Sequence, residues 1–407
     1  MSYDTIIIGA GAAGLFTAIN IKKGSVLILE KNFSAGKKIL ISGGSKCNFT
    51  NIESKEELLK HYYEHGNFLK HAIYNYSNTD IINYFGEMGI DTKIDEQGRV
   101  FPQSEKSTDI LKALLSNCDD RNIAFHYNTK ISDIFKKGND FIIKSNKGIL
   151  LSKVLVIASG GKSYPVTGSS GDGYKFAKKF NHSIIYPKPA LTSFRIENSK
   201  KFSLYGLSLK RKCISLYRMG KEIIKAKNDI LFTHNGISGP AVLNISRYAE
   251  RGDVLKINLT DFANEEMLKK DLIKKIKENR KKKIINILKM YDIPERIIIV
   301  IFNNLNIPLD LYAYELKKGI REDLIYSIVN FTLYIHKVDG FNKAMVTRGG
   351  IDLGEINSKT MESRLVKNLY FAGEILDIDG ETGGYNIQAA FSTGKLVADS
   401  INFNNED

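Results

Sequence analysis

Residues 4–15, with the sequence DTIIIGAGAAGL, decide the fold of this 407-residue chain. Thr5–Ile8 is an apolar run typical of a buried strand, and the glycine-rich turn after it opens an apolar helix. Gly9 permits the tight turn, Gly11 lets backbone approach a pyrophosphate, and Gly14 allows close helix–strand packing. Unpaired N–H groups at the start of such a helix bind phosphates. The predicted dinucleotide-binding residues are Gly9, Gly11, Ala12, Ala13 and Gly14.

An acidic residue follows at the distance that dinucleotide-binding folds use. Ser25–Glu30 is predicted to be the second strand, and Glu30 ends it 21 positions after Gly9. A carboxylate there accepts a hydrogen bond from a ribose hydroxyl and repels a 2′-phosphate, which favours FAD or NAD over NADP. Lys31, the next residue, is included in the predicted cofactor site.

A second glycine-rich segment near the C-terminus favours FAD. Asn368–Ala372 is predicted to be a strand that leads into Gly373 and Glu374, and acids in this position bind the ribityl chain in flavoproteins with two dinucleotide-binding motifs. A glycine-rich loop and a helix over Gln388–Ser400 follow, where N–H groups would face the flavin. An ordinary loop before a packing helix is the alternative. The predicted cofactor residues here are Gly373, Glu374, Gly384, Asn386 and Ile387.

The hydrophobic pattern changes along the middle of the chain. From Thr192 to Leu259 it has a period near 2, which predicts a β-rich insertion. Residues 263–328 have helical spacing. Thr332–Val338 and Lys343–Thr347 are predicted to be strands that return to the insertion.

Matching blocks of sequence run the full length of the chain. They are Gly9–Leu15, Gly36–Gly44 with Cys47–Asn51, Gly160–Pro165 with Thr167–Tyr174, Leu231–Pro240, Val346–Gly350 with Thr360–Ser363, and Ala372–Gln388. In these blocks the chain resembles the HI0933-like family of bacterial flavoproteins, also described as aminoacetone oxidase-like or BaiN/RdsA-like. One departure is Lys46, where the family usually has Arg, so the charge stays but a planar two-pronged donor is lost.

The resemblance implies an α/β fold with a two-dinucleotide-binding-type FAD domain formed by both termini, a β-rich insertion domain and a helical subdomain. The expected bounds are 1–190 and 345–407 for the FAD-binding domain, 191–260 and 330–344 for the β-rich domain, and 261–329 for the helical subdomain. It also implies that the segment Ile41–Asn51 runs near the flavin ring. Further cofactor residues expected from the matched blocks are Lys38, Ser42, Gly43, Gly160 and Gly161.

Two residues are candidates for catalysis. Cys47 would lie near the flavin by resemblance, where a thiol can deliver a proton to carbon as hydride leaves the flavin. A buried, inert small hydrophobe is the alternative for Cys47. His234 is predicted to lie in a turn that projects into a cleft, where histidine can donate or accept a proton near neutral pH. A turn-capping role is the alternative for His234.

Composition limits the other functions. Three cysteines far apart in sequence predict neither a disulfide framework nor a metal site, and no apolar run is long enough to span a membrane. A cytoplasmic protein is therefore expected. The absence of a second GxGxxG motif predicts no dedicated NAD(P)H domain, so NADH or NADPH would bind transiently as electron donor.

The net charge of +14 is compatible with two interpretations. A strongly basic protein attracts polyanions such as RNA, whereas AT-rich codons alone also produce a lysine-rich composition. The family resemblance implies reduction of uridine to dihydrouridine in large-subunit (23S) ribosomal RNA. The alternatives are a small-molecule ene-reductase that acts on a steroid-like enone, an amine oxidase, or a flavin-bearing RNA-binding or assembly factor without turnover.

Overall fold

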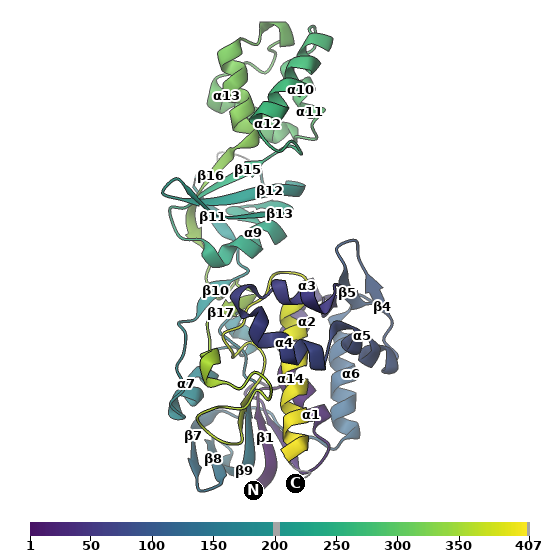
Figure 1. The fold of residues 1–407 in the computed structure, drawn as a ribbon, viewed down its shortest axis with the longest axis vertical. Coiled ribbons are helices and arrows are strands. Elements are labelled where there is room, and N and C mark those ends of the chain that lie inside the picture. The colour runs from purple at the N-terminus through teal and green to yellow at the C-terminus, as the bar shows by residue number, and fades with distance from the viewer. Residues whose placement is uncertain (198–203, 405–407) are drawn as a thin grey trace. The chain divides into compact units, whose positions relative to one another are not determined.

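The structure, a computed structural model, describes residues 1–197 and 204–404 and divides the chain into two compact units (Figure 1). Unit 1 contains Met1–Ala190 and Phe341–Asp407, and unit 2 contains Leu191–Gly340. Each unit has its own hydrophobic core. The predicted fold class is confirmed, because the two ends of the chain form one α/β unit and the inserted unit contains a β-barrel and helices.

Unit 1 is built on a seven-stranded sheet in the order β6-β2-β1-β9-β8-β7, with β18 also paired to β9. Strands β6, β2, β1, β9 and β18 are parallel, and β7 and β8 form an antiparallel meander with β9. β2 and β18 are fully buried apolar runs, as expected for a parallel sheet covered on both faces. The strands are β1 (Ser2–Ile8), β2 (Val26–Leu29), β6 (Ala124–His126), β7 (Ile131–Lys137), β8 (Asp140–Ser145), β9 (Gly148–Ile157) and β18 (Leu369–Phe371).

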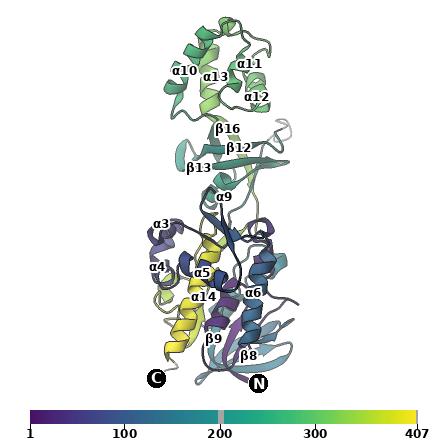
Figure 2. The same cartoon turned by 90° about the vertical axis from the view of Figure 1, so that its right-hand side faces the viewer.

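Helices and two small sheets complete unit 1. The first and last helices, α1 and α14, cross so closely that a Cβ added at Gly394 would lie 2.7 Å from the carbonyl oxygen of Ala13. Both termini lie at the same end of the unit (Figure 2). The helices are α1 (Ala12–Asn20), α2 (Lys37–Ile41), α3 (Lys55–Lys60), α4 (Gly66–Asn75), α5 (Asn78–Glu87), α6 (Ser107–Asp120), α7 (Asp172–Lys179) and α14 (Tyr385–Asn404), with 3₁₀ turns η1 (Ser42–Ser45), η2 (Tyr63–His65), η3 (Pro165–Thr167) and η6 (Leu353–Glu355). The small sheets pair β3 (Thr50–Asn51), β5 (Arg99–Pro102) and β4 (Thr92–Ile94), and β10 (Lys188–Ala190) with β17 (Val346–Arg348).

Unit 2 contains a closed barrel with the strand order β11-β14-β13-β12-β15-β16. In the described residues, helices α9 to α13 share one hydrophobic core with this barrel. The backbone of Leu259 donates a hydrogen bond to Ile328, which joins the barrel to α13. The strands are β11 (Phe194–Ile196), β12 (Ser208–Arg218), β13 (Lys221–Thr233), β14 (Gly236–Ser238), β15 (Val254–Asn258) and β16 (Phe331–Val338). The helices are α9 (Pro240–Ile245), α10 (Glu265–Glu278), α11 (Ile284–Lys289), α12 (Glu295–Leu305) and α13 (Lys318–Val329), with η4 (Ser246–Tyr248) and η5 (Ala313–Glu315).

Two expectations from the sequence differ from the structure. The strand expected over Lys343–Thr347 was wrong in place and partner, because β17 covers Val346–Arg348 and pairs with β10 in unit 1 rather than with the insertion. The last helix begins at Tyr385, three residues before the expected Gln388. The first turn follows Gly383 and Gly384 and contains the polar residue Asn386. The hydrophobic pattern therefore did not indicate where the helix begins.

Candidate cofactor and active site

The loops after three parallel strands meet at one edge of the sheet in unit 1. A Cβ added at Gly9, after β1, would lie 2.6 Å from the carbonyl oxygen of Ala158, after β9. A Cβ added at Gly373, after β18, would lie 2.8 Å from the Cβ of Ala13 in the first turn of α1. The carboxyl edge of an open parallel sheet is where dinucleotides bind, so this junction is the candidate cofactor site.

The glycines of the first turn have different surroundings. Gly9 has a φ of +106°, and a Cβ added at Gly14 would collide with the carbonyl oxygen of Gly9, so both serve the protein's own packing. Gly11 differs, because its φ is −86° and an added Cβ meets no atom within 4 Å. Open space beside the N-terminus of α1 is what a bound pyrophosphate requires. Ala12 and Ala13 form the first turn of α1 at this edge.

Glu30 directly follows β2, and its carboxylate has a hydrogen-bond acceptor position left over. Its side chain is buried, Oε2 accepts from the Ala10 N–H (3.0 Å), and Oε1 accepts from the backbone and side-chain nitrogens of Asn32 (both 2.8 Å). An ionised carboxylate has about four lone-pair sites, so one remains for a ribose hydroxyl. The neighbouring Lys31 forms an ion pair with Asp172 (2.8 Å) and a hydrogen bond with Ser170.

The acid expected near the ribityl chain lies in a polar network drawn from four segments. Glu374 accepts from the backbone N–H of Thr347 (2.7 Å) and from the Ser163 hydroxyl (2.8 Å) through Oε1, and from Lys38 (2.5 Å) through Oε2. Lys38 also donates to Ser163 (2.5 Å). The structure therefore brings together the predicted residues Lys38 and Glu374, which are 336 positions apart in sequence.

Glycines after β9 keep this network closely packed. A Cβ added at Gly161 would collide with the Thr347 side chain and lie 2.9 Å from Oε1 of Glu374. Gly160 has a φ of +71°, which suits the turn that leads away from the strand. Both predicted residues thus shape the site through backbone rather than through a side chain.

The segment from Ser42 to Cys47 has an unusual backbone. Gly43, Gly44, Ser45 and Cys47 all have positive φ values, between 55° and 69°. Non-glycine residues in this conformation store strain and concentrate at functional sites. The Cys47 backbone N–H donates to the carbonyl of Ser42 (3.0 Å), which closes the turn.

Cys47 is completely buried in the core of unit 1. Burial raises the pKa of its thiol to about 11, against a smaller lowering by a hydrogen bond with the Ser42 side chain. The thiol is therefore protonated at neutral pH. Lys46, at the position that departs from the family pattern, forms an ion pair with Glu105 (3.1 Å).

Two buried polar atoms in these loops lack a hydrogen-bond partner within the described residues, Oδ1 of Asn48 and Oγ of Ser159. Asn48 lies against the C-terminal loop, since a Cβ added at Gly384 would come within 2.8 Å of Oδ1. Unpaired buried polar atoms are costly unless a ligand or water satisfies them. Together with the open space at Gly11 and the spare acceptor of Glu30, they show that these residues fit FAD.

The start of α14 is fixed by Asn386. Its side chain accepts from the Gly380 N–H (2.9 Å) and donates to the Gly380 carbonyl (2.8 Å), so it closes the loop over Gly380–Tyr385. Ile387, the next residue, is half-buried. Gly384 has a φ of +99° and packs on the backbone of Thr50 in β3.

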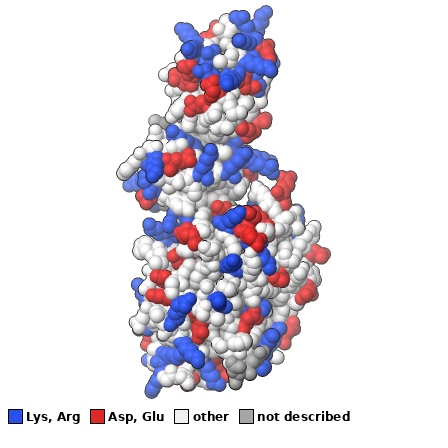
Figure 3. Space-filling view, in the orientation of Figure 1, with Lys and Arg blue, Asp and Glu red and all other residues white. Residues whose placement is uncertain are grey.

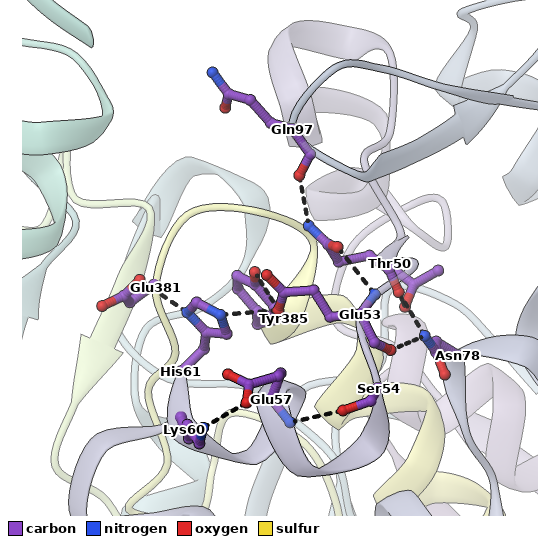
Figure 4. A network of polar contacts seen from close by, with 11 residues as sticks. Thr50, Glu53, Ser54, Glu57, Lys60, His61, Asn78, Gln97, Glu381 and Tyr385 are labelled. Atoms are coloured by element: carbon purple, nitrogen blue, oxygen red, sulfur yellow. Dashed lines mark hydrogen bonds and ion pairs between the residues drawn. The ribbon is translucent and has the colours of Figure 1, made fainter. Parts of the chain in front are cut away.

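A histidine between two carboxylates anchors the same loop (Figure 4). Nε2 of His61 lies 2.9 Å from Glu53, and Nδ1 lies 2.9 Å from Glu381. The His61 ring stacks on Tyr385, whose hydroxyl donates to Glu53 (3.1 Å). Burial acts to lower the pKa of His61, but the hydrogen bonds and charges of Glu381 and Glu53 outweigh it and raise the pKa.

The second candidate catalytic residue, His234, belongs to unit 2. It is exposed in the turn between β13 and β14, and its ring stacks on that of Tyr205. Its ring nitrogens make no hydrogen bond to another residue in the described parts of the chain. The two candidate catalytic residues thus lie in different units.

Sequence reasoning missed Ser163, Thr347, Asn48 and the His61 group. Ser163, Thr347 and Asn48 lie inside blocks that match the family. The match marked these positions as candidates, but it did not indicate what each residue does. His61 carried none, because its partners Glu53 and Glu381 are contributed by segments far apart in sequence.

Along the described residues no helix is both long and apolar enough to cross a bilayer. No group of three His, Cys, Asp or Glu side chains within residues 1–197 and 204–404 is placed to hold a metal ion.

Comparisons with known proteins cover almost the whole chain. The model of the HI0933-like protein Rossmann domain matches residues 3–400. A ribosomal RNA dihydrouridine synthase from Haemophilus influenzae is 35% identical over 98% of both chains, and a 3-dehydro-bile acid delta(4,6)-reductase from Clostridium scindens is 27% identical over 96% of this chain and 97% of that one. The crystal structure of a 3-ketosteroid-delta4-(5alpha)-dehydrogenase from Rhodococcus jostii shares the fold, with a TM-score of 0.55, 12% identity, and coverage of 98% of this chain and 96% of that one.

We expect Gly11→Val to leave the fold intact and to abolish FAD binding. The new side chain meets no protein atom but fills the space that the pyrophosphate needs. The purified variant should lack flavin absorbance and melt near the temperature of deflavinated wild type. Gly86→Val, which also enters open space but in α5, is the control and should stay yellow. A yellow Gly11→Val protein would contradict the placement of the cofactor.

We expect the contribution of His61 to stability to depend on pH. Because the folded-state pKa is raised above the ordinary value of 6.5, the stabilisation is fully present below about pH 6.5 and is lost as the pH rises through the folded-state pKa. The difference in Tm between wild type and His61→Gln should therefore be largest near pH 5.5 and shrink toward pH 9. The exposed His71, changed to Gln, should show no such trend. A Tm difference for His61→Gln that stays constant across this pH range would rule out a stabilising charged His61 between Glu53 and Glu381.

Proposed function

Because the chain belongs to the HI0933-like family and is an FAD-dependent oxidoreductase, we propose that it transfers hydride from reduced flavin to a conjugated carbon–carbon double bond, that of uridine in large-subunit (23S) ribosomal RNA. The product is dihydrouridine. The observation that carries this proposal is the relative named ribosomal RNA dihydrouridine synthase, which is 35% identical over 98% of both chains. A match of that extent includes the inserted unit as well as the cofactor unit.

A small-molecule enone is the second candidate substrate. It is favoured by the relative named as a bile acid reductase, at 27% identity over nearly the whole chain. Both substrates have a double bond conjugated to a carbonyl, so the same chemistry serves either one. We propose the RNA substrate first because the identity to the ribosomal RNA enzyme is larger, 35% against 27%.

Bound FAD supplies the hydride that reaches the carbon far from the carbonyl. The residues of the chain then have to hold the cofactor, supply a proton and stabilise the carbonyl oxygen. Glu30 and the open turn at Gly11 would hold the nucleotide end of FAD, and Lys38, Glu374 and the loop at Gly384 would hold the flavin end.

Cys47 is proposed to hold the proton that goes to the carbon next to the carbonyl. Its raised pKa keeps Sγ protonated until negative charge develops on the substrate, and the thiolate then regains a proton from solvent. The thiol is hydrogen-bonded to the side chain of Ser42, which is half-buried and also donates to the Ile39 carbonyl (2.6 Å). His234, exposed and with no ring hydrogen bond in the described parts of the chain, is proposed to donate to the substrate.

The electrons are proposed to come from NADH or NADPH bound transiently, because the sequence has a single GxGxxG motif. The cytoplasm, which contains both the nicotinamide cofactors and the ribosomal RNA, is the proposed location.

Deletion of the gene should remove one dihydrouridine from large-subunit ribosomal RNA. Nuclease digestion and mass spectrometry of RNA from strains with and without the gene measure this directly. Complementation with wild type should restore the dihydrouridine, and the Gly11→Val variant should not. Unchanged dihydrouridine in the deletion strain would overturn the RNA substrate, and activity on a free enone would then favour the second candidate.

Cys47→Ala should keep FAD and slow substrate reduction by roughly 10²-fold or more, the low end for loss of a positioned acid. Single-turnover reoxidation of the reduced protein by undermodified RNA measures the rate. Cys118→Ala is the matched control, since Cys118 is also completely buried but lies in α6. Wild-type turnover in Cys47→Ala would assign Cys47 a packing role.

A further inference from the structure

The positive charge of the chain is concentrated in unit 2. Residues 191–340 contain 28 Lys and Arg against 17 Asp and Glu, whereas the rest of the chain contains 31 against 28. Blue side chains are numerous over the helical part of this unit (Figure 3). Lysine itself is spread over both units, with 20 in residues 191–340 and 27 in the rest of the chain, as AT-rich codons would produce. The local clustering of cations within unit 2 is what requires a separate explanation.

The densest basic stretch is residues 274–283, at the end of α10 and in the loop to α11. It contains seven basic residues and one acid, Glu278. Arg280, Lys281 and Lys282 are exposed, and none of the three forms an ion pair with another residue in the described parts of the chain. Other lysines of the helical part form ion pairs, namely Lys269–Glu322, Lys275–Asp271 and Lys289–Glu295.

Two exposed tyrosines lie beside these cations. The backbone N–H of Ala313 donates to the carbonyl of Lys282 (2.9 Å), and that of Tyr314 donates to the carbonyl of Arg280 (3.3 Å). The rings of Tyr312 and Tyr314 stack with centroids 5.7 Å apart, and the two residues are 39% and 57% exposed. The carboxylate of Glu315 nearby is engaged by the backbone N–H of Tyr312 (2.8 Å).

We propose that this basic-aromatic patch, made of Arg280, Lys281, Lys282, Tyr312 and Tyr314, binds RNA. The unpaired cations hold phosphates, and the tyrosine rings stack an unpaired base. The proposal rests on the proposed function, because RNA as substrate is what gives the patch a partner. A lysine face that is merely solvated does not account for two stacked, exposed tyrosines on the adjoining segment, whereas such rings suit stacking with an unpaired RNA base.

The test uses the full-length holoenzyme and protein-free large-subunit ribosomal RNA from a strain that lacks the gene. Arg280→Gln/Lys281→Gln/Lys282→Gln should raise the Kd for RNA by at least about 10-fold near physiological salt and make the plot of log Kd against log salt shallower by about 2. FAD content and flavin reduction by NADH or NADPH should not change. The control Lys22→Gln/Lys23→Gln/Lys130→Gln removes the same charge from exposed positions of unit 1 and should leave the Kd within about 2-fold.

A second pair of variants tests the tyrosines. Tyr314→Ala should raise the Kd for RNA roughly 5-fold or more without changing the salt dependence, because a stacked base is lost but no charge. Tyr314→Phe keeps the ring and should bind like wild type. Equal Kd values for Tyr314→Ala and Tyr314→Phe would overturn base stacking at this position.

The outcomes separate this inference from the proposed function. If wild type binds and reduces the RNA while the triple variant and its control bind equally well, the patch is wrong and the function stands. If wild type neither binds nor reduces the RNA, the proposed function fails and the inference fails with it. Binding of phosphatidylglycerol vesicles through Arg280–Lys282, with no binding of RNA, would assign the patch to a membrane surface and overturn the proposal.

Discussion

The parallel pairing of β18 with the end of β9 is the interaction on which the site depends. β9 pairs with β8 along its first half and gives its last three residues to β18, so a sheet that starts at residue 2 is completed by residues 369–371. This pairing places Gly373 against the first turn of α1 and Glu374 beside Lys38 and Ser163. The polar group of Lys38, Ser163 and Glu374 forms only when both ends of the chain have joined, because Lys38 and Glu374 are 336 positions apart in sequence.

The insertion is compatible with this arrangement because it leaves and re-enters unit 1 through paired strands. β10 ends at Ala190, β17 begins at Val346, and the two form an antiparallel pair. Thr347 of β17 then binds Glu374 and accepts hydrogen bonds from the backbone of Lys162 and Ser163. Because the barrel and its helices have a separate core, their surface can carry a large charge without a cost to the packing of unit 1.

The sequence predicted what local patterns encode and missed what distant segments build together. The glycine spacing and the apolar run before it were enough for the first turn of the dinucleotide-binding fold, and the period near 2 was enough for a β-rich insertion. The ion pair of Lys38 with Glu374 and the clamp of His61 between Glu53 and Glu381 had no local signature, since each joins segments separated by hundreds of residues. The strand expected over Lys343–Thr347 was misplaced for the same reason, because alternation predicts a strand but does not identify its partner.

We propose that a flavin held by both ends of the chain reduces uridine in RNA. The most direct test is to measure whether the reduced flavin passes its electrons to RNA. The holoenzyme would be reduced anaerobically with NADH or NADPH and then mixed with undermodified large-subunit ribosomal RNA. We expect the flavin to be reoxidised and the RNA to gain one dihydrouridine for each flavin oxidised. A flavin that stays reduced in the presence of this RNA, yet is reoxidised by a small enone, would contradict this proposal.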